Sequence, residues 1–487
     1  MKRVRKRTKS KTFLGLHIGT FVVSAVIFGF YLGIVSLASL YQAATKVATN
    51  NQYLEIYSHF IHPNKQQTTL LLFQNNAELR YGGGFIGSVG VLNSGPGGYK
   101  LQPIRSVYYY DHRIDDRPSI TPVPPEMIGF IDRMHLRDSG IYLDWSKSAE
   151  LAAQYFEIES GQKVDNVVAI TPTTFKKLLA TTGPVELKEY GITVTEDNFL
   201  TEVQLEVESG EDKQNKKDPK TILGTLGNQV IQKLLEKKIA DLSQTTKILE
   251  EMIQQKQFML YSRDKAIQAK LEANDMAGRL SDFSGNSILV GEANIGANKS
   301  SPFIRQEIDQ ELSIGSDGEA TVNLRIRRTH TSDYQHQYLD PADNVTKWLV
   351  AQNVDKVKLY LPRGSKLIDS SLDTSQLSVR DEEGRTSVNY QNILAPLQSN
   401  EVTFRYSLPF KYALQDNKLS LTSLFEKQAG GFDQQIKFRV KLPKEYRLLL
   451  SSERELGQVA GDTNNTYQVG FIQQKNQVVS LVFERSN

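Results

Sequence analysis

The side chains best suited to chemistry in this chain lie in residues 74–87 and at the end of a strand expected over residues 99–110. The stretch reads QNNAELRYGGGFIG and combines amides, a carboxylate, a guanidinium and a run of glycines. Arginine pairs bidentately with phosphate, so Arg80, with Arg113 as a second cation, is suited to neutralise a pyrophosphate. Carboxylate oxygens are the ligands that Mg²⁺ prefers, so Glu78 and Asp111 are the expected Mg²⁺ ligands or general base. Arg80, Glu78 and Asp111 are therefore the candidate catalytic residues.

Hydrogen-bond donors surround these groups. Glycine has no Cβ and lets backbone amides approach a ligand closely. The expected ligand-binding residues are Asn75, Asn76, Gly82, Gly83, Gly84 and Arg113. A structural alternative stays open: Asn76, Glu78 and Arg80 simply close a turn, with Glu78 and Arg80 in an ion pair.

A central strand must position this polar stretch. Residues 70–73 form a continuous apolar run, which is typical of a strand buried on both faces. Residues 85–92 and 99–110 predict two further strands, separated by the turn sequence NSGPGG. Polar groups at strand ends beside flexible backbone are where ligands bind in layered α/β folds.

The next segment alternates helices and strands. Residues 147–156 predict a helix and residues 166–170 a short buried strand. Thr171 suits the N-cap of a helix over residues 173–180. This alternation predicts a mixed three-layer α/β domain over residues 67–300.

Two amphipathic helices are expected later in that domain, at residues 222–242 and 243–257. Two glycine patterns resemble nucleotide motifs without meeting their requirements. The run at 82–87 opens a predicted strand rather than a helix, and the second glycine of the pattern at 291–300 is not followed directly by lysine. Neither pattern therefore predicts a nucleotide site.

The last third of the chain changes to a period of two. Apolar Val322, Leu324 and Ile326 alternate with polar residues, and similar runs recur to the end of the chain. Many short alternating strands predict an all-β sandwich, or two small ones, over residues 301–487. The expected role of this part is spacing, binding or support.

The amino-terminal residues predict a membrane anchor. Residues 13–40 carry no Asp, Glu, Lys or Arg, and as a helix they would span about 42 Å, enough to cross a bilayer. A cleaved signal peptide is the rival interpretation, but its apolar region should be only about 7–15 residues long. The basic tail at 1–12 should stay in the cytoplasm, so the connector at 41–66 and the rest face outward.

Composition excludes several classes of function. Seven basic residues fall in the first eleven, and without them the formal charge of +3 becomes about −4, so no nucleic-acid-binding surface is expected. The chain has no cysteine, which excludes disulfides, thiolate metal sites and cysteine nucleophiles.

The sequence resembles a bacterial family of unknown function, number 4012. The resemblance rests on QNNAELR and GGFIG within residues 74–87, on NVVAI at 166–170, on Thr182–Val185 (TGPV) and on residues 294–299. It implies no established activity.

A more distant resemblance is to the LytR-CpsA-Psr family, membrane-anchored enzymes that move glycopolymers from polyprenyl-pyrophosphate carriers onto the cell wall. LLLFQNNAELR stands where that family has an apolar strand and a Gly-x-Asp-x-Arg-like motif, so the resemblance makes Arg80 the pyrophosphate-binding arginine. The sequence departs from the family at two points. Asn75 or Asn76 replaces the motif's aspartate, and residues 83–87 carry no charge where the family has an Arg-Ser-Asp-like motif.

Two functions follow from these observations and stay open. The first is a single-pass, membrane-anchored extracytoplasmic protein that binds or transfers polyprenyl-pyrophosphate-linked glycopolymer, with Mg²⁺ as its cofactor. The second is a non-enzymatic surface scaffold or adhesion protein that binds glycan or protein through its β-sandwich. If Arg80, Arg113, Glu78 and Asp111 meet in one cleft, the first is favoured; if they scatter, the second is.

Overall fold

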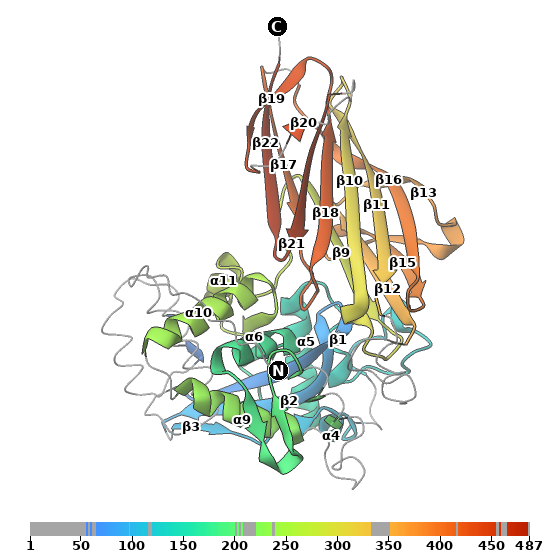
Figure 1. Ribbon diagram of the computed structural model, residues 1–487. Helices are drawn as coiled ribbons and strands as arrows, with labels where there is room; N and C mark the ends of the chain where they lie inside the picture. Colours follow the sequence, from blue (N-terminus) through green and yellow to red (C-terminus); the bar gives the residue numbers. More distant parts are fainter. Residues whose placement is uncertain are drawn as a thin grey trace.

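The computed structural model of the protein combines a mixed α/β module with an elongated β module (Figure 1). It describes residues 55–56, 59–60, 65–96, 98–114, 119–199, 202–203, 206–207, 221–235, 239–332, 351–414, 417–453, 457–458 and 465–485. The predicted basic tail, the apolar segment 13–40 and most of the connector lie outside these ranges. Within them, none of the helices has the length and apolarity needed to span a membrane.

One sheet forms the centre of the α/β module, in the order β3-β2-β1-β5-β8, with β4 also paired to β2. Its strands are β1 (Gln67–Arg80), β2 (Gly83–Gly95), β3 (Gly98–Leu101), β4 (Arg105–Ser106), β5 (Asn166–Ile170) and β8 (Phe258–Ser262). β1 is parallel to β5 and antiparallel to β2. The predicted central strand and the α/β class are therefore confirmed.

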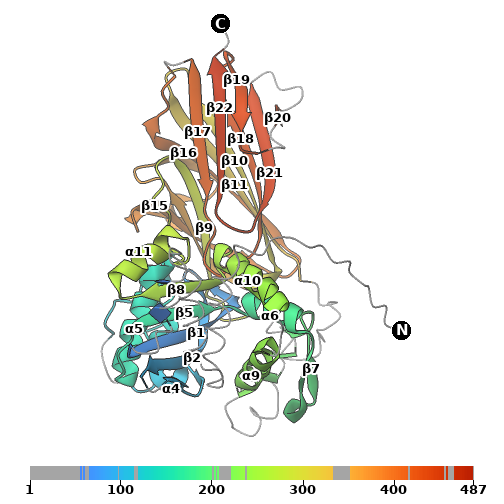
Figure 2. The same cartoon turned by 90° about the vertical axis from the view of Figure 1, so that its left-hand side faces the viewer.

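Helices cover both faces of this sheet, as successive side chains of β1 point to opposite sides. Leu70 and Leu72 pack with α5 (Trp145–Ser160) in one core. Leu71 packs on the other side in a core that includes residues of α10 (Ile239–Gln254) and α11 (Lys265–Ala273). Figure 2 shows α5 and α10 on opposite sides of the strands.

A smaller lobe extends from the module around a core of its own. It contains α6 (Pro172–Thr182), β6 (Val185–Leu187), β7 (Ile192–Val194) and α9 (Thr221–Leu235), and it contacts α10. The predicted helices over 222–242 and 243–257 correspond to α9 and α10, and residues 236–238 between them lie outside the described residues. Thr171 occupies the N-cap position, but its hydroxyl donates to Gln257 Oε1 at 2.7 Å instead of capping the helix.

The predicted strand over 99–110 was wrong in its second half. Pairing with β2 stops at Leu101 and resumes for two residues in β4. The chain then forms the short helix α4 (Tyr108–Asp111). Tyr110 packs against Phe156 of α5, with ring centroids 5.1 Å apart, and this tertiary contact holds the segment as a helix despite its high strand propensity.

The β module consists of two seven-stranded sheets around one hydrophobic core, a single β-sandwich. The first sheet contains β13 (Lys366–Ser370), β16 (Ser399–Lys411), β11 (Glu319–His330), β10 (Ile304–Ile314), β18 (Gln434–Lys441), β21 (Thr466–Gln473) and β20 (Gly457–Gln458). The second contains β14 (Ser378–Glu382), β15 (Arg385–Leu394), β12 (Asn353–Leu361), β9 (Asn286–Asn294), β17 (Lys418–Phe425), β22 (Gln477–Arg485) and β19 (Tyr446–Ser451). The predicted alternation is confirmed in β11, whose burial alternates along its length.

The sandwich begins earlier than the expected boundary between residues 300 and 301. β9 lies between β12 and β17 in the second sheet, so residues 286–294 belong to the β module. Its apolar run is buried on both faces and lacks the alternation that marks the other strands.

Candidate functional site

Arg80 and Glu78 form an ion pair at the end of β1. Arg80 Nη2 lies 2.6 Å from Glu78 Oε1, and the side chains are only 15% and 10% exposed. The other guanidinium nitrogen donates to the carbonyl oxygens of Leu79 and of Asn294 in β9. This geometry matches the structural alternative, in which the two residues close a turn, and it leaves Arg80 engaged within the protein.

The glycines beside this pair are packed closely against other residues of the protein. A Cβ on Gly84 would lie 2.4 Å from the carbonyl carbon of Asn75. Gly83 has a φ of +117°, and Gly82 would meet Ser148 Oγ at 2.6 Å. The close backbone approach expected of Gly82, Gly83 and Gly84 is present, but its partners are other segments of this chain.

A β-bulge directs Asn76 toward the sandwich. The pairing of β1 with β2 is interrupted between Asn75 and Leu79, and such bulges re-aim side chains. The buried Asn76 amide donates to Gly430 O at 3.0 Å and to Thr173 Oγ1 at 2.9 Å. Asn76 therefore ties the α/β module to the loop between β17 and β18.

That loop also supplies Gln428, which sequence reasoning missed. Its Nε2 donates to Arg80 O and to Glu292 O, both at 2.8 Å, and its Oε1 accepts from Glu292 N at 2.9 Å. Gly430 lies so close to the polar stretch that an added Cβ would be 2.6 Å from Gly83 O. Residues 74–84 thus form a joint between the two modules.

Buried charges form a second part of this joint. Lys358 of β12 is 2.6 Å from Glu126 Oε1 of η1 (Pro125–Met127) and also contacts Glu382. Burial alone would raise the pKa of Glu126, but the charges of Lys358 and Arg380 outweigh it and lower that pKa. Close by, Glu383 accepts from Leu143 N at 3.0 Å.

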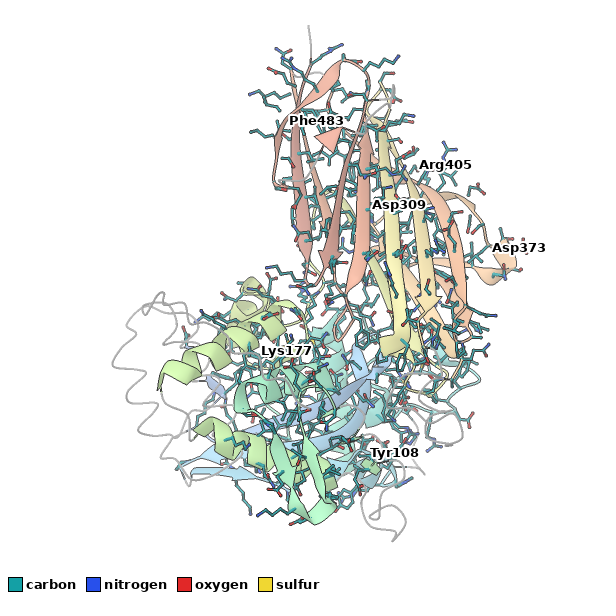
Figure 3. The ribbon with its side chains drawn as sticks, viewed as in Figure 1. Tyr108, Lys177, Asp309, Asp373, Arg405 and Phe483 are labelled. Carbon is teal, nitrogen blue, oxygen red and sulfur yellow. The ribbon has the colours of Figure 1, made fainter. Side chains whose placement is uncertain are left out.

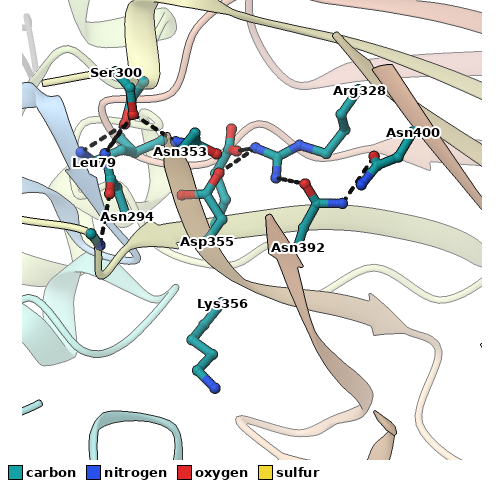
Figure 4. Close-up of polar contacts among 12 residues, drawn as sticks. Leu79, Asn294, Ser300, Arg328, Asn353, Asp355, Lys356, Asn392 and Asn400 are labelled. Carbon is teal, nitrogen blue, oxygen red and sulfur yellow. Dashed lines mark hydrogen bonds and ion pairs between the residues drawn. The ribbon is translucent and has the colours of Figure 1, made fainter. Parts of the chain in front are cut away.

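A network inside the sandwich adjoins the joint (Figure 4). Asn294 and Asn353 donate to Ser300 Oγ at 3.2 and 3.0 Å. Arg328, which is 1% exposed, pairs with Asp355 at 2.5 Å and with Glu292. Burial raises the pKa of Glu292 most, Arg328 lowers it, and Asp355 raises it again. The net result is a pKa of about 7.

Asp111 has a different ion-pair partner from Glu78. It is fully buried, and Arg137 Nη1 lies 2.6 Å from its Oδ2. Burial raises the pKa of Asp111, and burial together with Asp111 raises the pKa of the neighbouring Glu159 to about 8. Glu78 and Asp111 are thus each bound to a different arginine. Among the described residues, no three His, Asp or Glu side chains are placed to share a metal ion, so the Mg²⁺ prediction gains no support.

Arg113 lies on the exposed surface formed by α4. Its Nη2 donates to Tyr109 Oη at 2.6 Å, and its Cζ lies 4.5 Å from the centroid of that ring. Arg105, which sequence reasoning missed, lies at the same distance from the same ring. Tyr108 marks this region in Figure 3, on the α/β module and far from Phe483 in the sandwich. Arg80, Asp111 and Arg113 therefore differ in their hydrogen-bond and ion-pair partners, although Phe85, 5.5 Å from Arg80, and Tyr108, 5.4 Å from Arg137, lie between the first two.

Comparison with protein families identifies the amino-terminal part of this architecture. Residues 64–207 match the model of a family described as a protein of unknown function, DUF4012. The resemblance to that family is therefore shown for this segment of the chain. The matched segment contains the central strand β1, residues 74–84 of the joint and the α4 surface, so the resemblance drawn from QNNAELR and GGFIG is confirmed. Residues 294–299 lie outside the DUF4012 match. No curated protein matches the chain.

Three solved structures show remote similarity to this chain. A nutrient-binding protein from Legionella pneumophila has 9% identity and a TM-score of 0.29 over 41% of this chain and 70% of its own. An M1 zinc metallopeptidase from Deinococcus radiodurans has 9% identity and a TM-score of 0.21 over 37% of this chain. The matched region spans 42% of that peptidase, less than half its length. A protein from Listeria innocua has 12% identity and a TM-score of 0.23 over 47% of this chain and 86% of its own.

Proposed function

We propose that this protein is a membrane-anchored, extracytoplasmic and non-enzymatic component of the cell envelope, which holds a β-sandwich on a DUF4012 domain. The single observation that carries the proposal is the engagement of every candidate catalytic side chain in an internal contact. Arg80 is bound to Glu78, and Asp111 is bound to Arg137. These contacts support a structural role for the three side chains, because a general acid or base has to lie within hydrogen-bond reach of the proton that it transfers.

The joint supports a scaffold because it fixes the two modules together through buried polar contacts. Asn76, Gln428 and Lys358 each connect residues of the α/β module with residues of the sandwich. Buried polar groups are costly unless they are satisfied, so separating the modules would expose or orphan many of them. A ligand bound to the sandwich would therefore be held at a fixed position relative to the DUF4012 domain.

The membrane anchor and outward orientation rest on the apolar segment 13–40 and the basic residues before it. The lack of cysteine makes this directly testable by labelling single introduced thiols. We expect Ser378→Cys in the sandwich to react with a membrane-impermeant maleimide in intact cells. Ser10→Cys in the tail should react only after lysis. Labelling of Ser10→Cys and protection of Ser378→Cys in intact cells would refute this orientation.

The remaining alternative is transfer of lipid-linked glycopolymer, as the LytR-CpsA-Psr resemblance implies. We would assay the full chain in detergent for binding and transfer of a polyprenyl-pyrophosphate-linked oligosaccharide. The variants are Arg80→Ala and the exposed control Arg447→Ala. A scaffold predicts no transfer by any of the three proteins. Transfer by wild type and Arg447→Ala that is lost in Arg80→Ala would overturn the proposal.

A further inference from the structure

Two arginines share one exposed tyrosine ring on the α4 surface. The guanidinium carbons of Arg105 and Arg113 each lie 4.5 Å from the centroid of Tyr109. They are therefore within about 9 Å of one another. Among the residues that the structure describes, neither guanidinium has a carboxylate partner. This differs from Arg80, Arg137, Arg328 and Arg385, each of which is paired with an acid.

Two cations held this close repel each other, and the ring offsets only part of that repulsion. Cation–π contacts at exposed sites contribute about 0.5–1 kcal/mol each. An anionic group bound beside the ring would neutralise both charges. The planar guanidinium is suited to bidentate pairing with phosphate or carboxylate oxygens.

Aromatic rings extend the surface beside the two cations. Tyr108 is 42% exposed and Tyr109 44% exposed. The Tyr108 ring is stacked with His112, with centroids 6.2 Å apart, and lies 6.5 Å from Phe85. Exposed tyrosines combine a large apolar face with a polar tip, which suits the apolar faces and hydroxyl groups of a sugar.

The surface is held rigidly from below. Asp111, which follows these tyrosines in α4, is buried against Arg137, and Arg137 lies 5.4 Å from the Tyr108 ring. Tyr110 anchors the same helix to Phe156 in the core. Rigid contact groups lose little conformational freedom on binding, so the arrangement is preorganised for a ligand.

We propose that the surface formed by Arg105, Tyr108, Tyr109 and Arg113 is a binding site for an anionic polysaccharide. Acidic groups of the polymer pair with the two guanidinium groups, and sugar rings lie on the tyrosines. This inference deepens the proposed function and rests on it, because it places an envelope ligand on the DUF4012 domain in addition to any ligand of the sandwich. A lipid bilayer fits less well, because membrane-binding surfaces use clusters of about 4–8 basic residues.

The test uses the full chain in detergent and three dextrans that share one backbone. These are phosphorylated, carboxymethylated and unmodified dextran, and binding is measured at low and at high salt. We expect the two charged dextrans to bind and the neutral one to bind at least tenfold more weakly. Binding should weaken as salt rises, because these charges are exposed to solvent. Equal binding of charged and neutral dextran would overturn the proposal.

Variants then locate the site. Arg105→Gln/Arg113→Gln should weaken binding of charged dextran at least tenfold, whereas Arg363→Gln/Arg447→Gln, which removes equal charge from exposed positions on the sandwich, should not. Tyr109→Leu keeps both cations and should also weaken binding. Unchanged binding by the Arg105/Arg113 variant would refute this site. Binding to phosphatidylglycerol vesicles without binding to charged dextran would assign the surface to a membrane instead.

These results separate this inference from the proposed function. Lipid-linked oligosaccharide transfer that depends on Arg80 would contradict the scaffold proposal while leaving dextran binding intact. If the wild-type protein neither binds charged dextran nor transfers oligosaccharide, only the binding site on the DUF4012 domain is contradicted.

Discussion

The carboxylate of Glu78 and the guanidinium of Arg80, two residues apart on β1, lie 2.6 Å from each other at the contact between the two modules. Neighbouring positions i and i+2 lie on the same side of a strand, which lets the two side chains meet. The pair is nearly buried, and Arg80 also donates to Asn294 of the sandwich. The polar stretch of the DUF4012 domain therefore acts first as a structural joint.

Gly84→Ala should destabilise this joint. The added Cβ would lie within 2.4–2.6 Å of the backbone of Asn75 and Asn76, so β1 has to shift. Overpacking of this kind costs about 1–3 kcal/mol, measurable as a lower midpoint in urea unfolding. Gly224→Ala in α9 is the matched control, because nothing lies within 4 Å of its added Cβ. Equal midpoints for the two variants would contradict the joint's close packing.

Lys358→Met should loosen the two modules from each other. Removing the ammonium leaves Glu382 without its buried partner and Glu126 with the more distant Arg380, 3.6 Å away. Breaking a buried ion pair costs about 3–5 kcal/mol. We expect calorimetry to show a single unfolding transition for the wild type and separate transitions for the two modules of the variant. The exposed control Lys366→Met should unfold as the wild type does. A single unshifted transition for Lys358→Met would show that the modules do not depend on this contact.

Arg328→Met should destabilise the sandwich itself. The arginine comes from β11 in the first sheet and pairs with Glu292 and Asp355 of the second. Its loss leaves two buried carboxylates facing each other, at a cost of about 3–5 kcal/mol. Adding Glu292→Gln and Asp355→Asn to the variant removes the unpaired charges and should recover part of the loss in urea unfolding. No recovery would show that packing rather than charge sets the effect.

Glu159 should make stability fall as pH rises. Burial and Asp111 raise its folded-state pKa to about 8 from an ordinary value of 4.5. The folded state therefore keeps a proton that the unfolded state has lost, and the free energy of unfolding declines between these two pKa values. The decline is at most about 1.4 kcal/mol per pH unit.

Glu159→Gln removes this titration, because an amide can keep accepting from Leu136 N and carries no charge. Urea unfolding at pH 6 and pH 9 should show a smaller loss of stability for the variant than for the wild type. The exposed control Glu189→Gln should keep the wild-type slope. A variant slope as steep as the wild-type one would place the titrating group elsewhere.

Local patterns predicted most of the elements. The apolar run at 70–73 marked the central strand, and the period of two marked the sandwich strands. Residues 286–294 were assigned to the α/β domain because the period of two begins only after them, and a strand buried on both faces lacks that period. The extent of the strand over 99–110 was wrong because tyrosine favours strands, whereas tertiary contacts such as Tyr110 on Phe156 and Asp111 with Arg137 hold α4 in place.

The candidate site was less predictable than the fold. The residue types at 74–84 were read as a ligand site, but their partners are distant in the chain: Asn76 contacts Gly430, and Glu126 contacts Lys358. No periodicity or spacing records such long-range contacts. The Arg105–Tyr109 contact was missed for a different reason, because a predicted strand would have placed the intervening residues differently from α4.

The position of β1 has a mechanical consequence. The strand starts next to the connector and ends at the sandwich, with β2 along one edge and β5 along the other. If the amino terminus is anchored as proposed, tension from a load on the sandwich would act along this strand. The hydrogen bonds on both of its edges lie across that direction, so they must rupture together instead of one after another. Under the proposed function, this arrangement would resist separation of the two modules when a polymer bound to the sandwich is loaded.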